Sequence, residues 1–163
     1  MMLKLGKLVL ILGVLNFLGG CKKASTEKPK LILLNVLGKQ FFDDCHIAPS
    51  SAQVLSTVVE FEDLDSFADT LDRSIPVVLY CSNYQCTASG SGAALLHRKG
   101  FSSVYVYEGG MAEWKQKGLP VEGPCTEKYL FRVVEAPVGP VTDENLPYTI
   151  LTAEELHQKM LAA

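Results

Sequence analysis

The stretch Pro76-Val77-Val78-Leu79-Tyr80-Cys81 places four large apolar side chains between a proline and a cysteine. A run this short and this apolar, bounded by turn signals, predicts a strand that is buried on both faces. The residues that follow, 82–88, are polar or small and predict a loop. Ser89 stands where a helix N-cap is expected, so Cys81 lies between the end of a strand and the start of a helix.

Further strands and helices are predicted on both sides of this stretch. Strands are expected over residues 31–37, 54–61 and 103–107, which are rich in branched or aromatic side chains. Helices are expected over residues 64–71 with Asp63 as the cap, over residues 89–100, and around Trp114. The alternation predicts a single α/β domain over residues 31–122, with a parallel sheet flanked by helices on both faces. Ligands of such sheets bind beyond the C-terminal ends of the strands, where Cys81 lies.

The position of Cys81 favours a reactive thiol. Backbone N–H groups of the loop, together with the positive end of the following helix, would stabilise a thiolate. A thiolate is the form of cysteine that attacks sulfur. The formal net charge of the whole chain is −3, and its lysines concentrate only at residues 22–30, so nucleic acid is not an expected partner.

Several segments together resemble the rhodanese family over about residues 31–122. The strand ending in Cys81 matches the family's nucleophile strand, and the second half of the domain follows the family closely through Ala93-Ala94-Leu95-Leu96, Glu108-Gly109-Gly110-Met111-Ala112-Glu113-Trp114 and Gly118-Leu119-Pro120-Val121. Cys45-His46-Ile47 with Pro49 is similar to a family segment in which the histidine is structural. The first half matches more loosely.

The resemblance implies a sulfurtransferase, in which Cys81 carries sulfane sulfur as a persulfide. A small sulfur donor such as thiosulfate would supply the sulfur and a thiol would accept it. Backbone amides of the loop would bind the persulfide and the donor, namely those of Ser82, Asn83, Tyr84, Gln85, Thr87 and Ala88. The resemblance implies no metal and no organic cofactor, and no feature of the sequence identifies a protein partner.

Two departures from the family leave a second function open. The loop carries no charged residue, whereas thiosulfate-type members usually have Arg or Lys there, so thiosulfate turnover is expected to be poor. Asn35 and Leu37 replace a usual Asp and Arg. A catalytically inactive binding module with the same fold is therefore the alternative, because a fold alone does not establish a function.

The five cysteines add a third possibility. Cys86 lies five residues after Cys81. It is either a resolving thiol that closes a disulfide with Cys81, which would give a thiol-disulfide redox site, or a small buried residue near the start of the helix. Cys45 and Cys125 are expected to form a structural disulfide or to remain inert thiols. The sequence does not decide the pairing of these four.

The N-terminus predicts export and lipid anchoring. Lys4 and Lys7 precede a run without charge, residues 8–18, too short to span a bilayer and typical of a signal peptide over residues 1–20. Leu18-Gly19-Gly20-Cys21 resembles a bacterial lipobox, which implies lipidation of Cys21 and a tether over residues 21–30. The expected location is the periplasmic side of the cell envelope, with the outer membrane favoured over the inner; an uncleaved N-terminal anchor is the alternative.

The C-terminal extension, residues 123–163, is expected to complete the domain. A strand is predicted over residues 129–134, and Thr152-Ala153-Glu154-Glu155 predicts a capping box that starts a helix. Residues 148–156 read like the segment with which rhodanese domains commonly begin. We hypothesise that residues 148–161 dock where that segment normally sits, as in a circular permutation; an unrelated amphipathic tail helix is the alternative.

Overall fold

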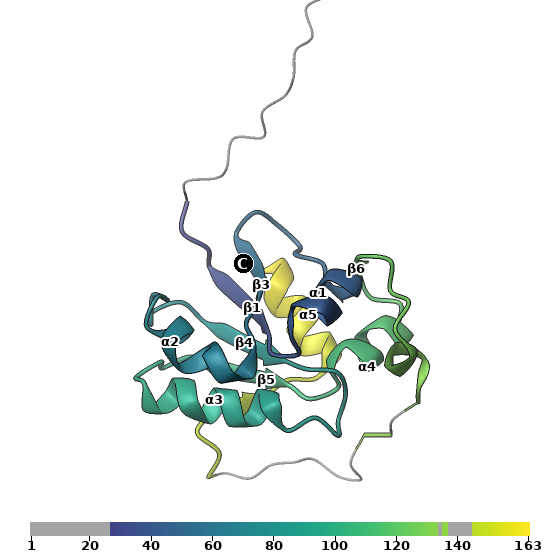
Figure 1. The fold of residues 1–163 in the computed structure, drawn as a ribbon. Helices are drawn as coiled ribbons and strands as arrows, with labels where there is room; N and C mark the ends of the chain where they lie inside the picture. The colour runs from purple at the N-terminus through teal and green to yellow at the C-terminus, as the bar shows by residue number, and fades with distance from the viewer. Residues whose placement is uncertain (1–26, 134, 137–144) are drawn as a thin grey trace, which may run out of the picture.

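A five-stranded parallel sheet organises the molecule, in a computed structural model that describes residues 27–133, 135–136 and 145–163 (Figure 1). The strand order is β3-β1-β4-β5-β7, and all four pairings are parallel. The strands are β1 (Leu31–Asn35), β3 (Val54–Val58), β4 (Val77–Tyr80), β5 (Val104–Tyr107) and β7 (Thr149–Ile150). The predicted α/β class and its parallel sheet are confirmed.

Helices cover both faces of the sheet, as predicted (Figure 1). The helices α2 (Leu64–Ala68) and α3 (Ala88–Arg98) lie on one face. The other face carries α1 (Lys39–Asp44), α4 (Gly110–Gln116) and α5 (Ala153–Leu161). A small antiparallel pair, β2 (His46–Ile47) with β6 (Val121–Glu122), borders this second face. None of the helices in the described part of the chain combines the length and apolarity needed to cross a membrane.

Strand β1 shows why the central strands are continuously apolar. Side chains alternate between the two faces of a strand, so Leu31 and Leu33 pack under α4 and α5 while Ile32 and Leu34 pack under α2 and α3. All five residues of β1 are buried. Strand β4 pairs with β1 and β5 and is likewise fully buried, which fixes the position of Cys81 at the end of the strand from two sides.

The predicted cap of α3 is wrong, and that of α2 is right in position only. Asp63 is the N-cap residue of α2, but it also ends a short 3₁₀ helix, η1 (Phe61–Asp63), and its side chain makes no capping hydrogen bond. Helix α3 begins at Ala88 with Thr87 as the N-cap residue, so Ser89 lies inside the helix and is 2% exposed. The reason is that the loop before α3 already turns into helical backbone geometry at Thr87, which leaves no extended residue at position 89.

The strand predicted over residues 129–134 is also wrong. Residues Lys128–Phe131 form a 3₁₀ helix, η2, in which Leu130 is the buried side chain, and residue 134 lies outside the described residues. The edge beside β5 is taken by β7 rather than by this segment.

The C-terminal segment docks onto the sheet. Strand β7 pairs in parallel with β5, and the Leu151 amide continues the ladder by donating to the Val106 carbonyl at 2.8 Å. The predicted capping box is confirmed, since Thr152 and Glu155 exchange both of its hydrogen bonds at the start of α5. Leu156 and Met160 are buried in the same core as Leu31, so the tail is docked as our hypothesis for it requires.

Candidate functional site

Cys81 lies at the C-terminal end of the central strand β4, at the bottom of a polar loop. Its side chain belongs to the core beneath α2 and α3, and the residue is 2% exposed. The preceding carbonyl, that of Tyr80, accepts a hydrogen bond from the Val36 amide at 3.1 Å. The sheet therefore anchors the backbone that leads into Cys81.

Helix α4 holds the loop from behind. The Met111 amide donates to the Cys81 carbonyl at 3.0 Å, and the Ala112 amide donates to the Ser82 carbonyl at 2.9 Å. Gly110 makes this approach possible: its φ is +60°, and a Cβ there would lie 2.5 Å from the Cys81 carbonyl oxygen. Gly110 is thus the residue that allows α4 to approach and bind the loop.

The loop folds back so that Cys86 meets Cys81. The Asn83 side-chain oxygen accepts from the Gln85 amide at 2.9 Å, and the Asn83 carbonyl accepts from the Cys86 amide at 3.0 Å. This compact turn, of a kind that asparagine favours, brings Cys86 to Cys81 as a disulfide, with 6.2 Å between the two Cα atoms. Such a separation lies within the normal disulfide range. The structure therefore places both loop cysteines in one site.

Some amides of the loop are engaged within the loop itself in this oxidised arrangement. Two amides of the loop, those of Gln85 and Cys86, donate to Asn83. The Cys81 sulfur has the Ser82 hydroxyl as a polar neighbour, at 4.0 Å. Binding of a persulfide by the loop amides therefore stays a prediction for the reduced loop.

The surroundings of the loop are acidic. Glu113 accepts a hydrogen bond from the Tyr107 hydroxyl at 2.8 Å and pairs with Lys117 at 3.6 Å. Burial, and then the carboxylates of Glu113 and Glu108, raise the pKa of Tyr84 to about 12. Each carboxylate disfavours a further negative charge nearby, an effect that Lys117 reduces at Glu113.

Two hollows adjoin the loop. A pocket of about 250 Å³ is lined by residues that include Cys86, Tyr84, Ser89, Glu108 and Tyr148. A cavity of about 70 Å³ on another side is lined in part by Asn83, Tyr84, Glu113 and Arg132. Sequence reasoning missed Glu108, Arg132 and Tyr148 as site residues, because they come from distant segments that only the folded chain brings to the loop.

Asn35 stands at the turn behind the loop, in place of the aspartate that is usual in the family. Its side-chain oxygen accepts from the Leu37 amide at 2.8 Å, and the residue is fully buried. Its Nδ2 has no hydrogen-bond partner among the described residues. The turn is therefore held by a neutral amide, which keeps the backbone in place without adding charge near Cys81.

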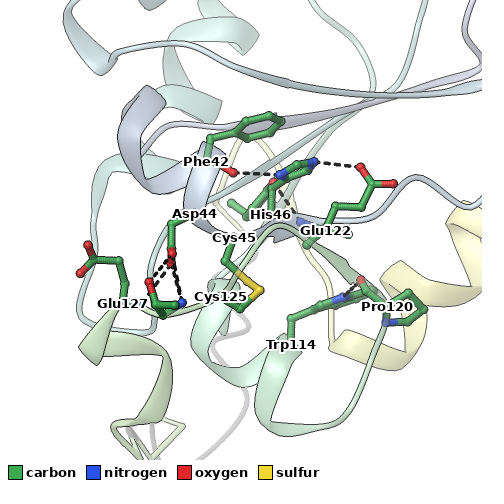
Figure 2. Close-up of a disulfide and its surroundings, with 12 residues drawn as sticks. Phe42, Asp44, Cys45, His46, Trp114, Pro120, Glu122, Cys125 and Glu127 are labelled. Atoms are coloured by element: carbon green, nitrogen blue, oxygen red, sulfur yellow. Dashed lines mark hydrogen bonds and ion pairs between the residues drawn. A yellow bond between two sulfur atoms is a disulfide. The ribbon is translucent and has the colours of Figure 1, made fainter.

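A second disulfide clamps the C-terminal extension to the domain (Figure 2). Cys45 and Cys125 are bonded across 80 positions in the chain, with Cα atoms 4.6 Å apart. Beside them, the Asp44 carboxylate accepts hydrogen bonds from Thr126 and from the Glu127 amide. Burial raises the pKa of Asp44, but these hydrogen bonds outweigh burial and lower it. Of the two possibilities left by the sequence for this cysteine pair, the structure has the disulfide.

His46 lies near the Cys45–Cys125 disulfide rather than at the loop. Its ring stacks on Phe42, contacts the Phe42 carbonyl at 2.8 Å and pairs with Glu122 at 3.2 Å (Figure 2). These contacts fit the structural role that the family resemblance implies. In the described part of the chain, no three His, Cys, Asp or Glu side chains are grouped so as to hold a metal ion.

The fold and the site define a parallel α/β domain with a cysteine at the end of its central strand. Residues 21–117 match the rhodanese-like domain family. The match covers more than half of the chain, and the chain belongs to this family.

Curated relatives agree with the assignment. The chain is 36% identical over 61 residues to the thiosulfate sulfurtransferase GlpE of Actinobacillus pleuropneumoniae, covering 37% of this chain and 55% of the relative. It is 41% identical over 56 residues to the protein of the same name from Actinobacillus succinogenes, covering 34% and 49%. The chain thus spans about half the length of the curated relatives it matches.

Solved structures agree on the fold. The Alr3790 protein from Anabaena superposes with a TM-score of 0.50 at 28% identity, covering 59% of this chain and 70% of that chain. The BH2092 protein from Bacillus halodurans superposes with a TM-score of 0.53 at 20% identity, covering 64% and 72%. At 20% identity, the likeness to the BH2092 protein supports the fold alone.

Proposed function

We propose that this protein is an envelope-anchored sulfurtransferase that carries sulfane sulfur as a persulfide on Cys81. The single observation that carries the proposal is the place of Cys81, at the end of the central strand of a rhodanese-like fold, with its carbonyl held by α4. The curated relatives are named thiosulfate sulfurtransferases, which fits this chemistry.

Loading begins from the reduced loop. The Cys81 thiolate attacks the sulfane sulfur of the donor, forms a new S–S bond and expels the rest of the donor with the bonding electron pair, as sulfite when the donor is thiosulfate. An external thiolate then attacks the outer sulfur and leaves with it, which returns Cys81 as a thiolate. The acidic surroundings favour a donor of lower negative charge than thiosulfate, such as an organic persulfide.

Cys86 offers a second route of discharge. Its thiolate would attack the inner sulfur, that of Cys81, and release the outer sulfur as hydrosulfide. The product is the Cys81–Cys86 disulfide that the structure contains. A thiol reductant must then reopen that disulfide before the next loading step.

Anchoring at the envelope is the second part of the proposal. It is supported by the basic start, the uncharged run of residues 8–18 and the lipobox-like sequence before Cys21. These residues lie outside the described ones. Metabolic labelling with a palmitate analogue is expected to mark the chain and to fail for Cys21→Ala.

The test of the chemistry is the intact mass of the full chain, purified in detergent and reduced. After incubation with thiosulfate or with a polysulfide, the wild-type chain is expected to gain one sulfur atom and to pass it to an added thiol. Cys81→Ser removes the proposed carrier, and Cys45→Ala/Cys125→Ala is the matched control that removes two cysteines elsewhere. A gain of sulfur that survives in Cys81→Ser would refute the assignment of the carrier.

The disulfide itself favours a second candidate, a thiol-disulfide redox site without sulfur transfer. In that case the reduced chain gains no sulfur from any donor, while the Cys81–Cys86 pair exchanges with external thiols at a defined reduction potential. The third possibility, a binding module, predicts neither sulfur loading nor measurable exchange of the loop disulfide. The same purified chain separates the three.

A further inference from the structure

The two sulfurs of the loop disulfide differ in access to solvent. Cys81 is 2% exposed and belongs to the core, whereas Cys86 is only half-buried and packs at the edge of that core. Cys86 also lines the pocket of about 250 Å³ beside the loop, and Cys81 is not among the residues that line it. An incoming thiolate must approach the sulfur it attacks, so access decides which sulfur reacts.

The pocket has walls suited to a small polar thiol. Tyr84 comes from the loop, Ser89 from the first turn of α3, and Tyr148 from the C-terminal extension just before β7. Glu108 is the one charged residue among the described residues of the lining, which contains no Lys or Arg. The pocket therefore combines hydroxyl groups, one carboxylate and an accessible disulfide sulfur.

We propose that this pocket is the entry site of an external thiol of neutral or positive charge, which opens the loop disulfide by attacking the sulfur of Cys86. The thiolate forms a bond to that sulfur, the Cys81–Cys86 bond breaks, and the electron pair leaves with Cys81 as a thiolate. A second equivalent of the thiol then attacks the mixed disulfide, releasing Cys86 and a disulfide of the two external thiols. This step rests on the proposed function only because sulfur transfer requires the Cys81 thiolate, which opening of the disulfide regenerates.

The position of attack is tested on the wild-type full chain in detergent, with its loop oxidised. A limiting amount of cysteamine is added, the reaction is quenched in acid after a short time, free thiols are alkylated, and peptides are analysed by mass spectrometry. We expect cysteamine on Cys86 and the alkyl group on Cys81. Cysteamine found mainly on Cys81 would overturn the proposal.

The charge preference is tested by opening the disulfide with cysteamine, 2-mercaptoethanol and thioglycolate, which differ stepwise by one unit of charge. Each rate is divided by the rate of the same thiol with bis(2-hydroxyethyl) disulfide, which removes differences in thiol pKa. One carboxylate at roughly 6 Å in water changes the rate about threefold per unit of charge, or about tenfold across the series at low salt. We expect the order cysteamine, 2-mercaptoethanol, thioglycolate.

Glu108→Gln is expected to flatten this order, while the exposed Glu127→Gln, beside the Cys45–Cys125 clamp, keeps it. A steep order that persists in Glu108→Gln, or no order in the wild type, would overturn the role of the pocket charge. The sulfur-loading assay is independent of both measurements. If cysteamine maps to Cys86 but the reduced chain gains no sulfur, the entry site stands and the sulfurtransferase proposal fails.

Discussion

Gly110→Ala is the substitution that best separates the site from the rest of the fold. A Cβ at position 110 would lie 2.5 Å from the Cys81 carbonyl oxygen, 2.6 Å from the Ser82 carbonyl carbon and 2.8 Å from the Asn83 nitrogen. All three are backbone atoms, so either the loop or α4 must move. Relief of such contacts requires a shift approaching one ångström, and a misplacement of about 1 Å can cost about 100-fold in rate.

The stability cost has two parts. A non-glycine residue in left-handed backbone geometry costs about 1–2 kcal/mol. The shift also weakens the hydrogen bonds from the Met111 and Ala112 amides to the loop, each worth about 1 kcal/mol. We therefore expect Gly110→Ala to lower the free energy of unfolding by about 3 kcal/mol.

Gly118→Ala provides the matched control. Gly118 has a φ of +69°, close to that of Gly110, but a Cβ there would meet nothing within 4 Å. It should lose only the backbone part, about 1–2 kcal/mol by urea unfolding, and keep the wild-type rate of sulfur loading. Equal losses of stability in the two variants, or an unchanged loading rate in Gly110→Ala, would refute the reasoning that α4 positions the loop.

Three further predictions concern the disulfides and the clamp. Cys45→Ala/Cys125→Ala opens a link across 80 positions, and the chain-entropy relation predicts a loss of about 4.5 kcal/mol in urea unfolding; a loss below about 1 kcal/mol would contradict it. Since the pKa of Asp44 is lowered in the folded state, its contribution is present above the unfolded value of 3.8 and is lost as the pH falls through the folded value. Asp44→Asn should therefore reduce stability at neutral pH, by about 1–3 kcal/mol, and flatten the acid limb of the stability profile. Cys86→Ser should retain its persulfide longer than the wild type and release hydrosulfide more slowly, as followed by intact mass and a sulfide probe.

The strands could be predicted because their local composition alone indicates that they are buried. Strands β1 and β4 are apolar at every position, or nearly so, since helices cover both faces of the sheet, and this pattern needs no knowledge of distant contacts. The capping box at Thr152 was equally local. The cap expected at Ser89 failed because a compact turn at Asn83 had already directed the chain into helical geometry at Thr87.

The composition of the site could not be predicted in the same way. Glu108 and Glu113 approach the loop only after β5 and α4 have folded against β4, and the charge of the loop itself is zero. The Cys45–Cys125 pair joins segments 80 positions apart, which no local pattern connects. Cys81 could be identified because the sequence alone shows a cysteine at the end of a strand that is buried on both faces. The residues that surround Cys81 could not be identified in this way, because only the tertiary structure brings them to the loop.

The C-terminal extension is part of the candidate site and not merely of the fold. It supplies β7, which pairs with β5, and β5 leads directly into Glu108 and the Gly109-Gly110 turn that holds the loop. It also supplies Tyr148, whose hydroxyl lies over the first turn of α3, since a Cβ at Gly90 would approach it to 2.9 Å. Removing the extension would therefore expose the edge of β5 and open one wall of the Cys86 pocket together. This one segment therefore couples the stability of the sheet to the access of a thiol to the loop disulfide. We expect the reactivity of Cys86 to change whenever the docking of β7 is disturbed.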